Sequence, residues 1–374
     1  MTMRLLIDDN VTPSYGLAAD ETLAQRVGLN LSAPTLRLYT YQSHCALVGR
    51  FQNVENEIRV EYCRENNIPI NRRPTGGGAI IMGADQLGVA LVTQGRGNND
   101  YSNARELMQN FSEGLVRGLN QLGVAATFRH KNDIEVNGKK LVGLGVYRAP
   151  SGGLLFHASL LVDLDIELML KVLNTPFEKI SDKEISTISE RMTTVRREMN
   201  NAIKLDDVRA EIAKGFASSL DVELVPASLT FDEAQAVSAL EKEKYLQYDW
   251  VYQTSEVADA VGSSKIKTDA GLLDVRVTMA GAMIKAAFIG GDFFAEENSI
   301  ADLELSLRWH TSQRDKVSAT VRKIYQRREN QFNGIQPEVV IEALTKAISR
   351  AQVAESQMRS DPYGCYVNPG GQYA

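Results

Sequence analysis

The sequence lacks the features that mark several large classes of protein. Its three cysteines, Cys45, Cys63 and Cys365, cannot all pair within one chain and show no CxxC spacing, so we expect no disulfide scaffold. Four histidines form no HExxH or HxH pattern, which argues against a zinc site. No run of about 18 apolar residues is present, so no membrane span is expected. The apolar stretch after Met1 is too short for a secretory signal. These absences favour a cytoplasmic enzyme.

The sequence also lacks a large excess of either positive or negative charge. The chain has 41 Lys and Arg against 47 Asp and Glu, a net charge of −6. This balance does not favour general affinity for nucleic acid or membranes, although it leaves room for a local basic cleft. With 374 residues, 44% hydrophobic and 24% charged, the chain has the composition of a soluble globular protein with two or three domains.

Hydrophobic periodicity predicts an α+β fold for the larger, N-terminal part of the chain. The expected elements are helices over 13–28, 61–67 and 104–121 and strands over 35–51, 79–82, 87–93, 139–148 and 154–162. The strands at 79–82 and 87–93 are expected to form a hairpin. Because hairpins and helices mix, we expect packed helices on mixed or antiparallel sheets rather than a Rossmann arrangement.

The remaining sequence predicts a second, smaller α+β domain. We expect a catalytic domain over 1–245, an accessory C-terminal domain over 246–355 and a flexible tail over 356–374. Residues 166–220 read as mostly helical, and the polar, alanine-rich stretch over 222–260 reads as a linker. Apolar residues alternate with polar ones over 273–279, which predicts a half-buried strand. Ser299 and Asp302 are interpreted as a capping box that opens a helix, with further helices over 314–329 and 337–353.

Arginine and glycine gather at one point of the first domain. The run Arg72-Arg73-Pro74-Thr75-Gly76-Gly77-Gly78 precedes an apolar strand. Successive glycines let the backbone approach a ligand closely, and their N–H groups can form a nest that binds an anion. The two guanidinium groups would add planar donors for phosphate or carboxylate. The run is neither a Walker A loop nor GxGxxG. The residues alone leave two interpretations open, an anion-binding loop or a glycine-rich turn beside surface arginines.

A second polar cluster lies between Asn132 and Gly143. Lys140 opens an apolar strand and could hold a negative charge, although a lysine at such a position is more often solvated. Asp133 could bind Mg²⁺ through oxygen or cap a turn. His157 lies within an apolar strand, where a histidine is more often a core residue than a catalyst.

Taken together, these segments resemble the lipoate–protein ligase A family, within the biotin/lipoate protein ligase superfamily. The resemblance covers about residues 5–355 and rests on the order and spacing of several motifs. They are Arg72 to Ile80, Asn132-Asp133-Ile134 followed by Lys140-Leu141-Val142-Gly143, His157 to Leu161, Ala19 to Leu23, Gly49 to Asn53, and Gly290 to Phe294, the last similar to the accessory C-terminal domain of the ligases.

The resemblance implies a two-step, ATP-dependent reaction. Lipoate or octanoate and ATP, with Mg²⁺, would give the acyl-adenylate, and the acyl group would then pass to a lysine of a lipoyl carrier domain. Such carriers are the acyltransferase subunit of a 2-oxoacid dehydrogenase or a glycine-cleavage H-like protein. By the same resemblance Lys140 is the catalytic residue, Arg73 with Arg72 behind it holds phosphate, and Asp133 orients the adenylate or Mg²⁺. The other implied binding residues are Thr75, Gly76, Gly77, Gly78, Ala79, Asn132, Gly143 and His157. The resemblance also favours a monomer, and from the balance of charge we expect no nucleic-acid or membrane partner.

The sequence departs from the family at two points. Family members often carry Phe-His-Asp after the glycines, whereas here the run is Ile81-Met82-Gly83-Ala84-Asp85, and His157 is followed by Ala158 instead of glycine. These changes leave the choice between lipoate and octanoate open.

Two rival functions remain. An ATP-independent lipoyl or octanoyl transferase would need an activated cysteine, but the chain has none between Arg64 and Gly364. The second rival function is that of a non-catalytic relative that binds lipoate. A biotin ligase is less favoured, because the GRGRRG loop of that family is absent.

Overall fold

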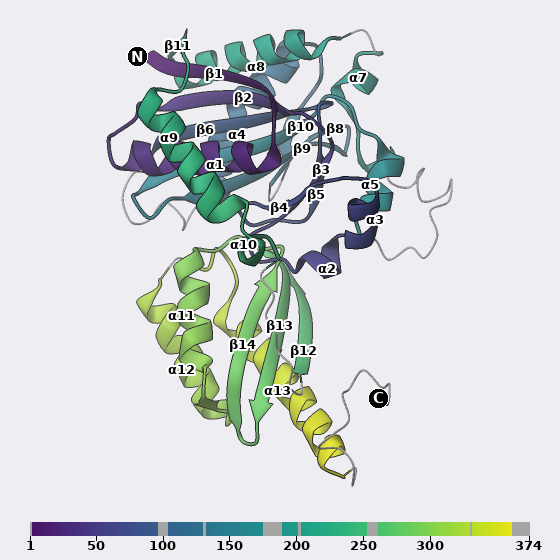
Figure 1. The fold of residues 1–374 in the computed structure, drawn as a ribbon, viewed down its shortest axis with the longest axis vertical. Helices are drawn as coiled ribbons and strands as arrows, with labels where there is room; N and C mark the ends of the chain where they lie inside the picture. The colour runs from purple at the N-terminus through teal and green to yellow at the C-terminus, as the bar shows by residue number, and fades with distance from the viewer. Residues whose placement is uncertain are drawn as a thin grey trace. The chain divides into compact units, whose positions relative to one another are not determined.

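The chain forms two compact units, Met1–Gln253 and Thr254–Ala374 (Figure 1). The computed structural model describes residues 2–95, 104–129, 132–174, 189–200, 203–252, 261–329 and 331–360. Each unit combines helices with mixed or antiparallel sheets, which confirms the predicted α+β class. The predicted tail over 356–374 lies mostly outside the described residues, as do His130 and Cys365.

The elements of the first unit follow most of the predicted periodicity. Its strands are β1 (Thr2–Val11), β2 (Thr35–Tyr41), β3 (Cys45–Val48), β4 (Ile70–Arg72), β5 (Ile80–Met82), β6 (Gln86–Gln94), β7 (Thr127–Arg129), β8 (Asp133–Val136), β9 (Lys139–Arg148), β10 (Gly153–Leu161) and β11 (Glu223–Pro226). Its helices are α1 (Pro13–Gly28), α2 (Val54–Glu57), α3 (Val60–Glu65), α4 (Ala104–Gln121), α5 (Ile166–Val172), α7 (Val195–Glu198), α8 (Leu205–Leu220), α9 (Phe231–Leu240), the π-helix η1 (Glu241–Tyr245) and α10 (Tyr248–Tyr252).

An eight-stranded sheet in the order β11-β1-β2-β6-β10-β9-β8-β7 forms the centre of this unit. Alternation along a strand sends successive side chains to opposite faces. On β10, Leu155 packs into the core under α1, whereas the Phe156 ring lies 5.8 Å from that of Phe111 on α4. Helices therefore cover both faces (Figure 1), and His157, two residues after Leu155, points to the α1 side.

The predicted hairpin between the strands at 79–82 and 87–93 is wrong. Strand β5 pairs with β3 in a separate three-stranded sheet, β4-β3-β5, while β6 lies between β2 and β10 in the large sheet. Both edges of β6 are thus occupied, which leaves none for β5. The short connection after Met82 carries the chain from one sheet to the other, so two sheets meet beside the glycine run.

The predicted linker over 222–260 is also wrong for its described part. Strand β11 joins the large sheet beside β1, and a capping box formed by Thr230 and Glu233 starts α9. The prediction took polar composition as a sign of solvent exposure, whereas the charged side chains of this region form ion pairs within the first unit. Arg4 donates to both carboxylate oxygens of Glu233 at 2.9 and 3.0 Å, and Lys244 donates to both oxygens of buried Glu21 at 2.8 Å.

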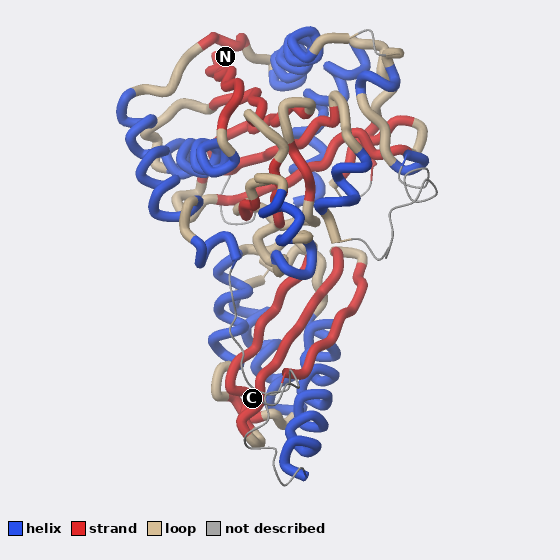
Figure 2. Tube along the Cα trace, turned by 45° about the vertical axis from the view of Figure 1, so that its right-hand side comes forward, coloured by secondary structure: helices blue, strands red, loops and turns tan. Residues whose placement is uncertain are grey.

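The second unit is a four-stranded antiparallel sheet with helices against one face (Figure 2). Its elements are β12 (Val261–Thr268), β13 (Gly271–Ala280), β14 (Met283–Gly291), β15 (His310–Thr311), α11 (Glu297–Leu307), α12 (Arg314–Arg327) and α13 (Pro337–Ser360). The alternating apolar residues predicted over 273–279 are buried in β13 as expected. The predicted capping box is wrong, because α11 begins before Ser299 and the Asp302 carboxylate instead accepts hydrogen bonds from Arg327 and Arg328.

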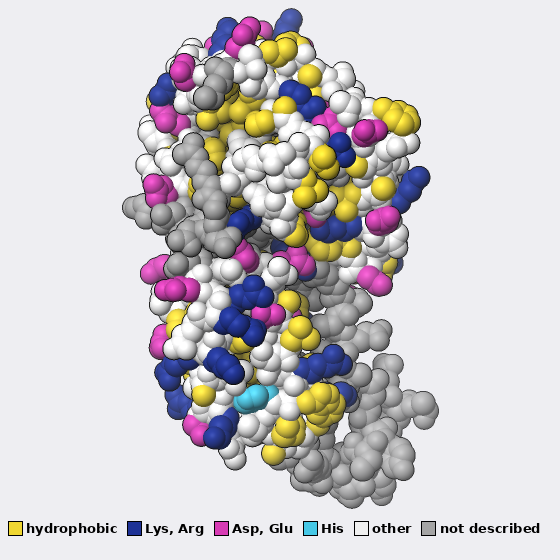
Figure 3. Space-filling model, turned by 90° about the vertical axis from the view of Figure 1, so that its left-hand side faces the viewer, with side chains coloured by type: hydrophobic (Ala, Val, Ile, Leu, Met, Phe, Trp, Pro, Cys, Tyr) yellow, Lys and Arg dark blue, Asp and Glu magenta, His cyan; other side chains and the backbone are white. Residues whose placement is uncertain are grey.

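Surface charge is mixed over the second unit. On the side covered by α11 and α12, Lys and Arg side chains gather among scattered acidic and apolar ones (Figure 3), and Arg314, Lys316 and Lys323 of α12 are exposed. Among the helices in the described ranges, none combines the length and hydropathy that a bilayer-crossing segment needs.

Candidate active site

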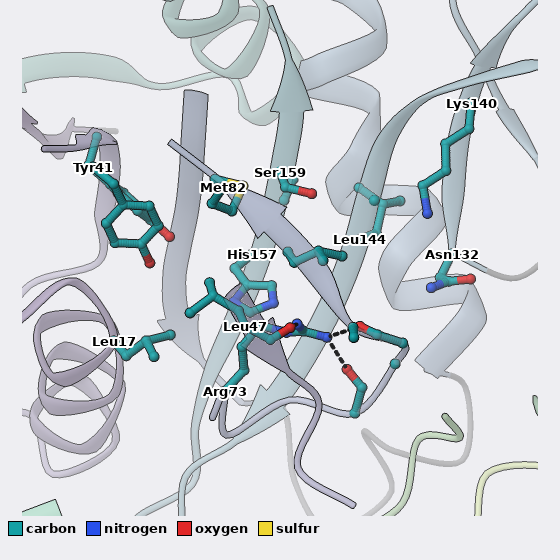
Figure 4. Close-up of a pocket in the computed structure, with 18 residues that line it drawn as sticks. Leu17, Tyr41, Leu47, Arg73, Met82, Asn132, Lys140, Leu144, His157 and Ser159 are labelled. Atoms are coloured by element: carbon teal, nitrogen blue, oxygen red, sulfur yellow. Dashed lines mark hydrogen bonds between the residues drawn. The ribbon is translucent and has the colours of Figure 1, made fainter. Parts of the chain in front are cut away.

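A cavity of about 110 Å³ lies in the first unit, where the glycine run meets β9 and β10 (Figure 4). It brings together residues that the sequence places far apart and that we expect at the site. Those that line it are Arg73, Gly76, Gly77, Gly78, Ala79, Asn132, Lys140, Gly143 and His157. Arg72, Thr75 and Asp133 are not in the lining. Thr75 and Asp133 each contact a residue that is, His157 and Lys140, whereas Arg72 contacts the segment 49–52 behind the glycine loop.

The hairpin β8–β9 carries Asn132 and Lys140 to one side of the cavity (Figure 4). Its turn is Asn137-Gly138, and both residues have positive φ, 50° and 79°, as the two-residue turns favoured by hairpins require. A β-bulge near Glu135 shifts the register opposite Lys140. The sequence Asn-Gly therefore fixes where β9 begins, and thereby places Lys140.

The Lys140 ammonium is paired with a neighbouring carboxylate. Its Nζ lies 2.7 Å from Oδ1 of Asp133. Gly143 leaves space for this side chain, since a Cβ there would lie 3.4 Å from Nζ and 3.2 Å from Ser159 Oγ. The backbone is fixed as well, because Thr193 N–H donates to the Lys140 carbonyl at 2.9 Å. Lys140 thus stands at the cavity in a defined position while its side chain remains one-third exposed.

The triple-glycine loop forms another wall. Gly77 has φ of +95°, a conformation that favours glycine, and its carbonyl lies so close to Gly49 that a Cβ on Gly49 would stand 2.0 Å from it. A Cβ on Gly78 would meet nothing within 4 Å. The loop is therefore packed tightly from behind and open in front, where backbone can approach a ligand.

Two buried arginines hold this loop from behind. Arg73 donates to the carbonyl oxygens of Leu47, Gly76 and Gly78 at 2.8, 3.3 and 2.8 Å. Burial lowers the pKa of Arg73 to about 10. In the described chain, every hydrogen-bond acceptor of these two guanidinium groups is a backbone carbonyl. Their positive charges are not balanced by a bonded carboxylate, so they favour an anion in the cavity.

Arg72 does not take the position expected of a phosphate ligand. Its guanidinium is fully buried, lies outside the cavity lining and bonds the carbonyls of residues 49, 50, 52, 250 and 251. Burial, followed by the charges of Arg50 and Arg73, lowers its pKa. The geometry therefore supports a role behind the loop instead of direct contact with phosphate.

His157 is held in one environment by Thr75. Thr75 Oγ1 and His157 Nε2 form a hydrogen bond of 2.9 Å, and Gly145 on the adjacent strand makes room for the ring, since a Cβ there would stand 2.7 Å from Nε2. Burial, and secondly the charge of Arg73, lowers the pKa of His157 to about 3. His157 is therefore neutral near pH 7. Sequence analysis missed Gly145, whose place opposite His157 follows only from the strand register.

The apolar side of the cavity comes from residues that the sequence presents only as core. Leu17 of α1 and Tyr41 of β2 lie on the side of the view opposite Lys140 and Asn132 (Figure 4). The rest of the apolar lining is Tyr39, Leu47, Ile80, Met82, Leu144 and Ala158. Strand β2 is buried along its whole length, so its sequence gave no signal of which side chains reach a cavity. The cavity thus has a cationic, glycine-walled side and an apolar side, which suits an acyl chain ending in an acid.

The residues present do not fit a protein-bound Mg²⁺ at Asp133. Its carboxylate oxygen is already 2.7 Å from an ammonium group, which repels a metal ion. Within the described ranges no cluster of three or more His, Cys, Asp or Glu side chains gathers to hold a metal.

Neither described cysteine belongs to the cavity lining. Cys45 lies in β3 and Cys63 in α3, and both are buried. Burial raises the pKa of the Cys45 thiol far above its ordinary range and that of Cys63 to about 11. Neither thiol is an activated nucleophile at neutral pH.

Comparison with known proteins identifies the family. A family model of the lipoyl protein ligase A/B catalytic domain matches residues 12–217, more than half of the chain, and the chain belongs to this family. The match includes the glycine run, the β8–β9 hairpin and His157.

Two curated relatives carry different names. The chain is 30% identical over 267 residues to an octanoyltransferase LipM of Clostridioides difficile, covering 66% of this chain and 97% of that protein. It is 28% identical over 249 residues to the lipoate-protein ligase LplJ of Bacillus subtilis, covering 66% and 73%. The family is thus enzymatic, and its members include both ligases and transferases.

Solved structures share the fold. The chain is similar to a bipartite lipoate protein ligase of Thermoplasma acidophilum, studied with its E2 lipoyl domain, with a TM-score of 0.60 and 28% identity over 69% of this chain and 99% of that one. It is also similar to a lipoate-protein ligase A bound with ATP, with a TM-score of 0.59 and 25% identity over 67% and 99%.

Proposed function

We propose that this protein is an ATP-dependent lipoate–protein ligase, which activates lipoate or octanoate and transfers the acyl group to a lysine of a lipoyl carrier domain. The observation that carries the proposal is the position of Lys140 beside the open triple-glycine loop, in front of buried arginines that bond no carboxylate within the described ranges. Its partners by this proposal are carriers such as the acyltransferase subunit of a 2-oxoacid dehydrogenase. Lys140, the catalytic residue of this proposal, belongs to the first unit, Met1–Gln253.

The first step joins two anions, and the cavity offers charge to hold them. A carboxylate oxygen of the acid attacks the α-phosphorus of ATP, the bond to the β,γ-phosphates breaks, and pyrophosphate leaves with the electron pair. In this scheme Lys140 would bind the acyl phosphate, and the open backbone at Gly78 would let it approach closely. The apolar side of the cavity, which includes Leu17 and Tyr41, would hold the acyl chain. Magnesium enters this scheme as the counter-ion of ATP in solution.

The second step transfers the acyl group from phosphate to nitrogen. The neutral amine of the carrier lysine attacks the acyl carbon, an amide forms, AMP leaves with the electron pair, and the amine loses a proton to solvent. His157 is neutral and holds its ring against Thr75, so we assign it a lining role.

The second candidate is an octanoyl transferase that needs no ATP, and the similarity to LipM favours it. That chemistry requires a thiolate to carry the acyl group. Cys45 and Cys63 are buried, have raised pKa values and do not line the cavity. The ligase is therefore preferred.

The deciding experiment uses the purified full chain, a lipoyl carrier domain and either lipoate with Mg-ATP or an octanoyl carrier thioester. Carrier mass and pyrophosphate release are followed together. The ligase predicts acylation only with ATP, with one pyrophosphate per acyl group. Acylation from the thioester without ATP would establish the transferase instead, and binding of lipoate without turnover would indicate a non-catalytic relative.

A further inference from the structure

Trp250 of α10 is joined to Arg72 by reciprocal hydrogen bonds. The indole Nε1–H donates to the Arg72 carbonyl at 3.1 Å, and Arg72 Nε donates to the Trp250 carbonyl at 3.0 Å. Asn71 adds a bond to the Tyr245 carbonyl at 2.9 Å. The segment that ends the first unit is thus fastened to β4, which leads directly into the glycine run.

The same arginine carries this connection to the glycine loop. Its NH1 group donates to the carbonyls of Gly49, Arg50 and Gln52 at 2.9, 3.0 and 2.6 Å. The segment 49–52 in turn supports the loop, because Arg50 N–H donates to the Thr75 carbonyl at 2.8 Å and Gly49 packs against Gly77. Trp250 is therefore connected to the triple glycine through two intermediates, first Arg72 and then the segment 49–52.

Two cationic side chains lie over the Trp250 ring. The Lys244 ammonium lies 3.9 Å and the Arg50 guanidinium 4.8 Å from its ring centroid, within the range of cation–π attraction. Lys244 is fixed by Glu21, whereas Arg50 belongs to the segment under the loop. A shift of that segment would therefore change the surroundings of the indole.

We infer that Trp250 is a positioning residue for the triple-glycine loop, acting through Arg72 and the segment 49–52, and that anion binding at the loop is transmitted back to its indole. This inference rests on the proposed function, because it takes the phosphates of ATP or the adenylate as the anion. No direct contact between Trp250 and ligand is involved. Equilibrium coupling of this kind is reciprocal, so the residue that positions the loop also reports its occupancy.

The chain offers a direct test because it contains two tryptophans, Trp250 and Trp309. Trp309 belongs to the second unit and is more than half exposed. In the Trp309→Phe variant all indole fluorescence comes from Trp250. Titration with Mg-ATP, and separately with a non-hydrolysable acyl-adenylate analogue, should change its emission and saturate at the concentration found by calorimetry. Calorimetric binding without a change in emission would overturn the inference and leave the proposed function standing. If neither calorimetry nor fluorescence detects binding, both the inference on Trp250 and the proposed function are overturned.

A second arm measures the effect on catalysis. Trp250→Phe keeps an aromatic ring and the backbone bonds but removes the indole donor to Arg72. We expect the KM for ATP in pyrophosphate release to rise about fivefold, as loss of one hydrogen bond allows, with kcat within about twofold. Trp309→Phe is the matched control and should leave both constants unchanged. A Trp250→Phe protein that only melts earlier, with KM and kcat of the folded protein unaltered, would reduce Trp250 to a packing residue and contradict the inference.

Discussion

Lys140 and Asp133 form an ion pair on the cationic, glycine-walled side of the cavity, with Nζ 2.7 Å from Oδ1. The two residues come from opposite strands of one hairpin. Asp133 therefore holds the ammonium at the cavity when no phosphate is bound, and a bound acyl phosphate would share that ammonium with it.

Lys140→Ala should reduce adenylate formation at least about a hundredfold, because the other cation of the described lining, Arg73, is bonded to backbone carbonyls behind the loop and cannot replace this charge where it develops on the phosphate. The measurement is pyrophosphate release with lipoate and ATP. Lys139→Ala is the matched control, since successive residues of a strand point to opposite faces, and it should retain activity. Thermal melting should be similar for both variants. A Lys140→Ala enzyme with normal pyrophosphate release would refute the assignment.

Asp133→Asn distinguishes a counter-ion of Lys140 from a ligand of magnesium. The amide keeps the shape of the side chain but not its charge, so Lys140 loses its anchor and we expect adenylate formation to fall roughly tenfold through misplacement. The Mg²⁺ concentration for half-maximal activity should stay within about twofold of wild type, because the pair leaves no room for a metal. A large increase in that concentration would instead make Asp133 a metal ligand.

Gly78→Ala tests whether a ligand approaches the open side of the glycine loop. The added Cβ meets nothing within 4 Å, so the melting temperature should not change, but the methyl group would project where ligand is expected. We expect the KM for ATP or lipoate to rise about tenfold, which corresponds to roughly 1.4 kcal/mol of binding energy. Gly49→Ala is the contrasting variant, since its Cβ would stand 2.0 Å from the Gly77 carbonyl and should lower stability. An unchanged KM for Gly78→Ala would place the ligand elsewhere.

Sequence reasoning located much of this site because short-range signals define it. The arginine–glycine run and the polar cluster between Asn132 and Gly143 are local, and each residue type has a direct physical consequence. What could not be read was which strands pair. Strand β5 turned away from β6. Tyr39 and Tyr41 reached the cavity, and Gly145 came to lie against His157, only through tertiary packing. The stretch 222–260 looked like a linker because the contacts that hold its described part, Lys244 to Glu21 and Trp250 to Arg72, are polar and distant in sequence.

Cys45→Ala and Cys63→Ala, singly and together, should leave ATP-dependent acylation within about twofold of wild type. Both thiols are buried, neither lines the cavity, and burial keeps them protonated. Loss of the buried sulfur can lower the melting temperature, so activity is compared at a temperature where all variants are folded. An inactive but folded single variant would revive the thioester route, and mass analysis of that cysteine after incubation with an octanoyl thioester would identify the acyl-enzyme.

His157 should make the first unit sensitive to acid. Burial lowers its pKa to about 3 in the folded chain, whereas the unfolded chain has the ordinary value of 6.5. Between these values the unfolded state binds a proton that the folded state does not, so the free energy of unfolding falls as pH falls, by about 1.4 kcal/mol per pH unit, and above pH 6.5 the effect vanishes. His157→Gln, which keeps a polar side chain beside Thr75, removes this contribution. Urea unfolding followed by Trp250 fluorescence in the Trp309→Phe background should show a shallower loss of stability from pH 6 to pH 4 for His157→Gln than for its parent. Parallel pH dependences for the two proteins would mean that His157 takes up its proton in the folded state, and would contradict the neutral lining role proposed for it.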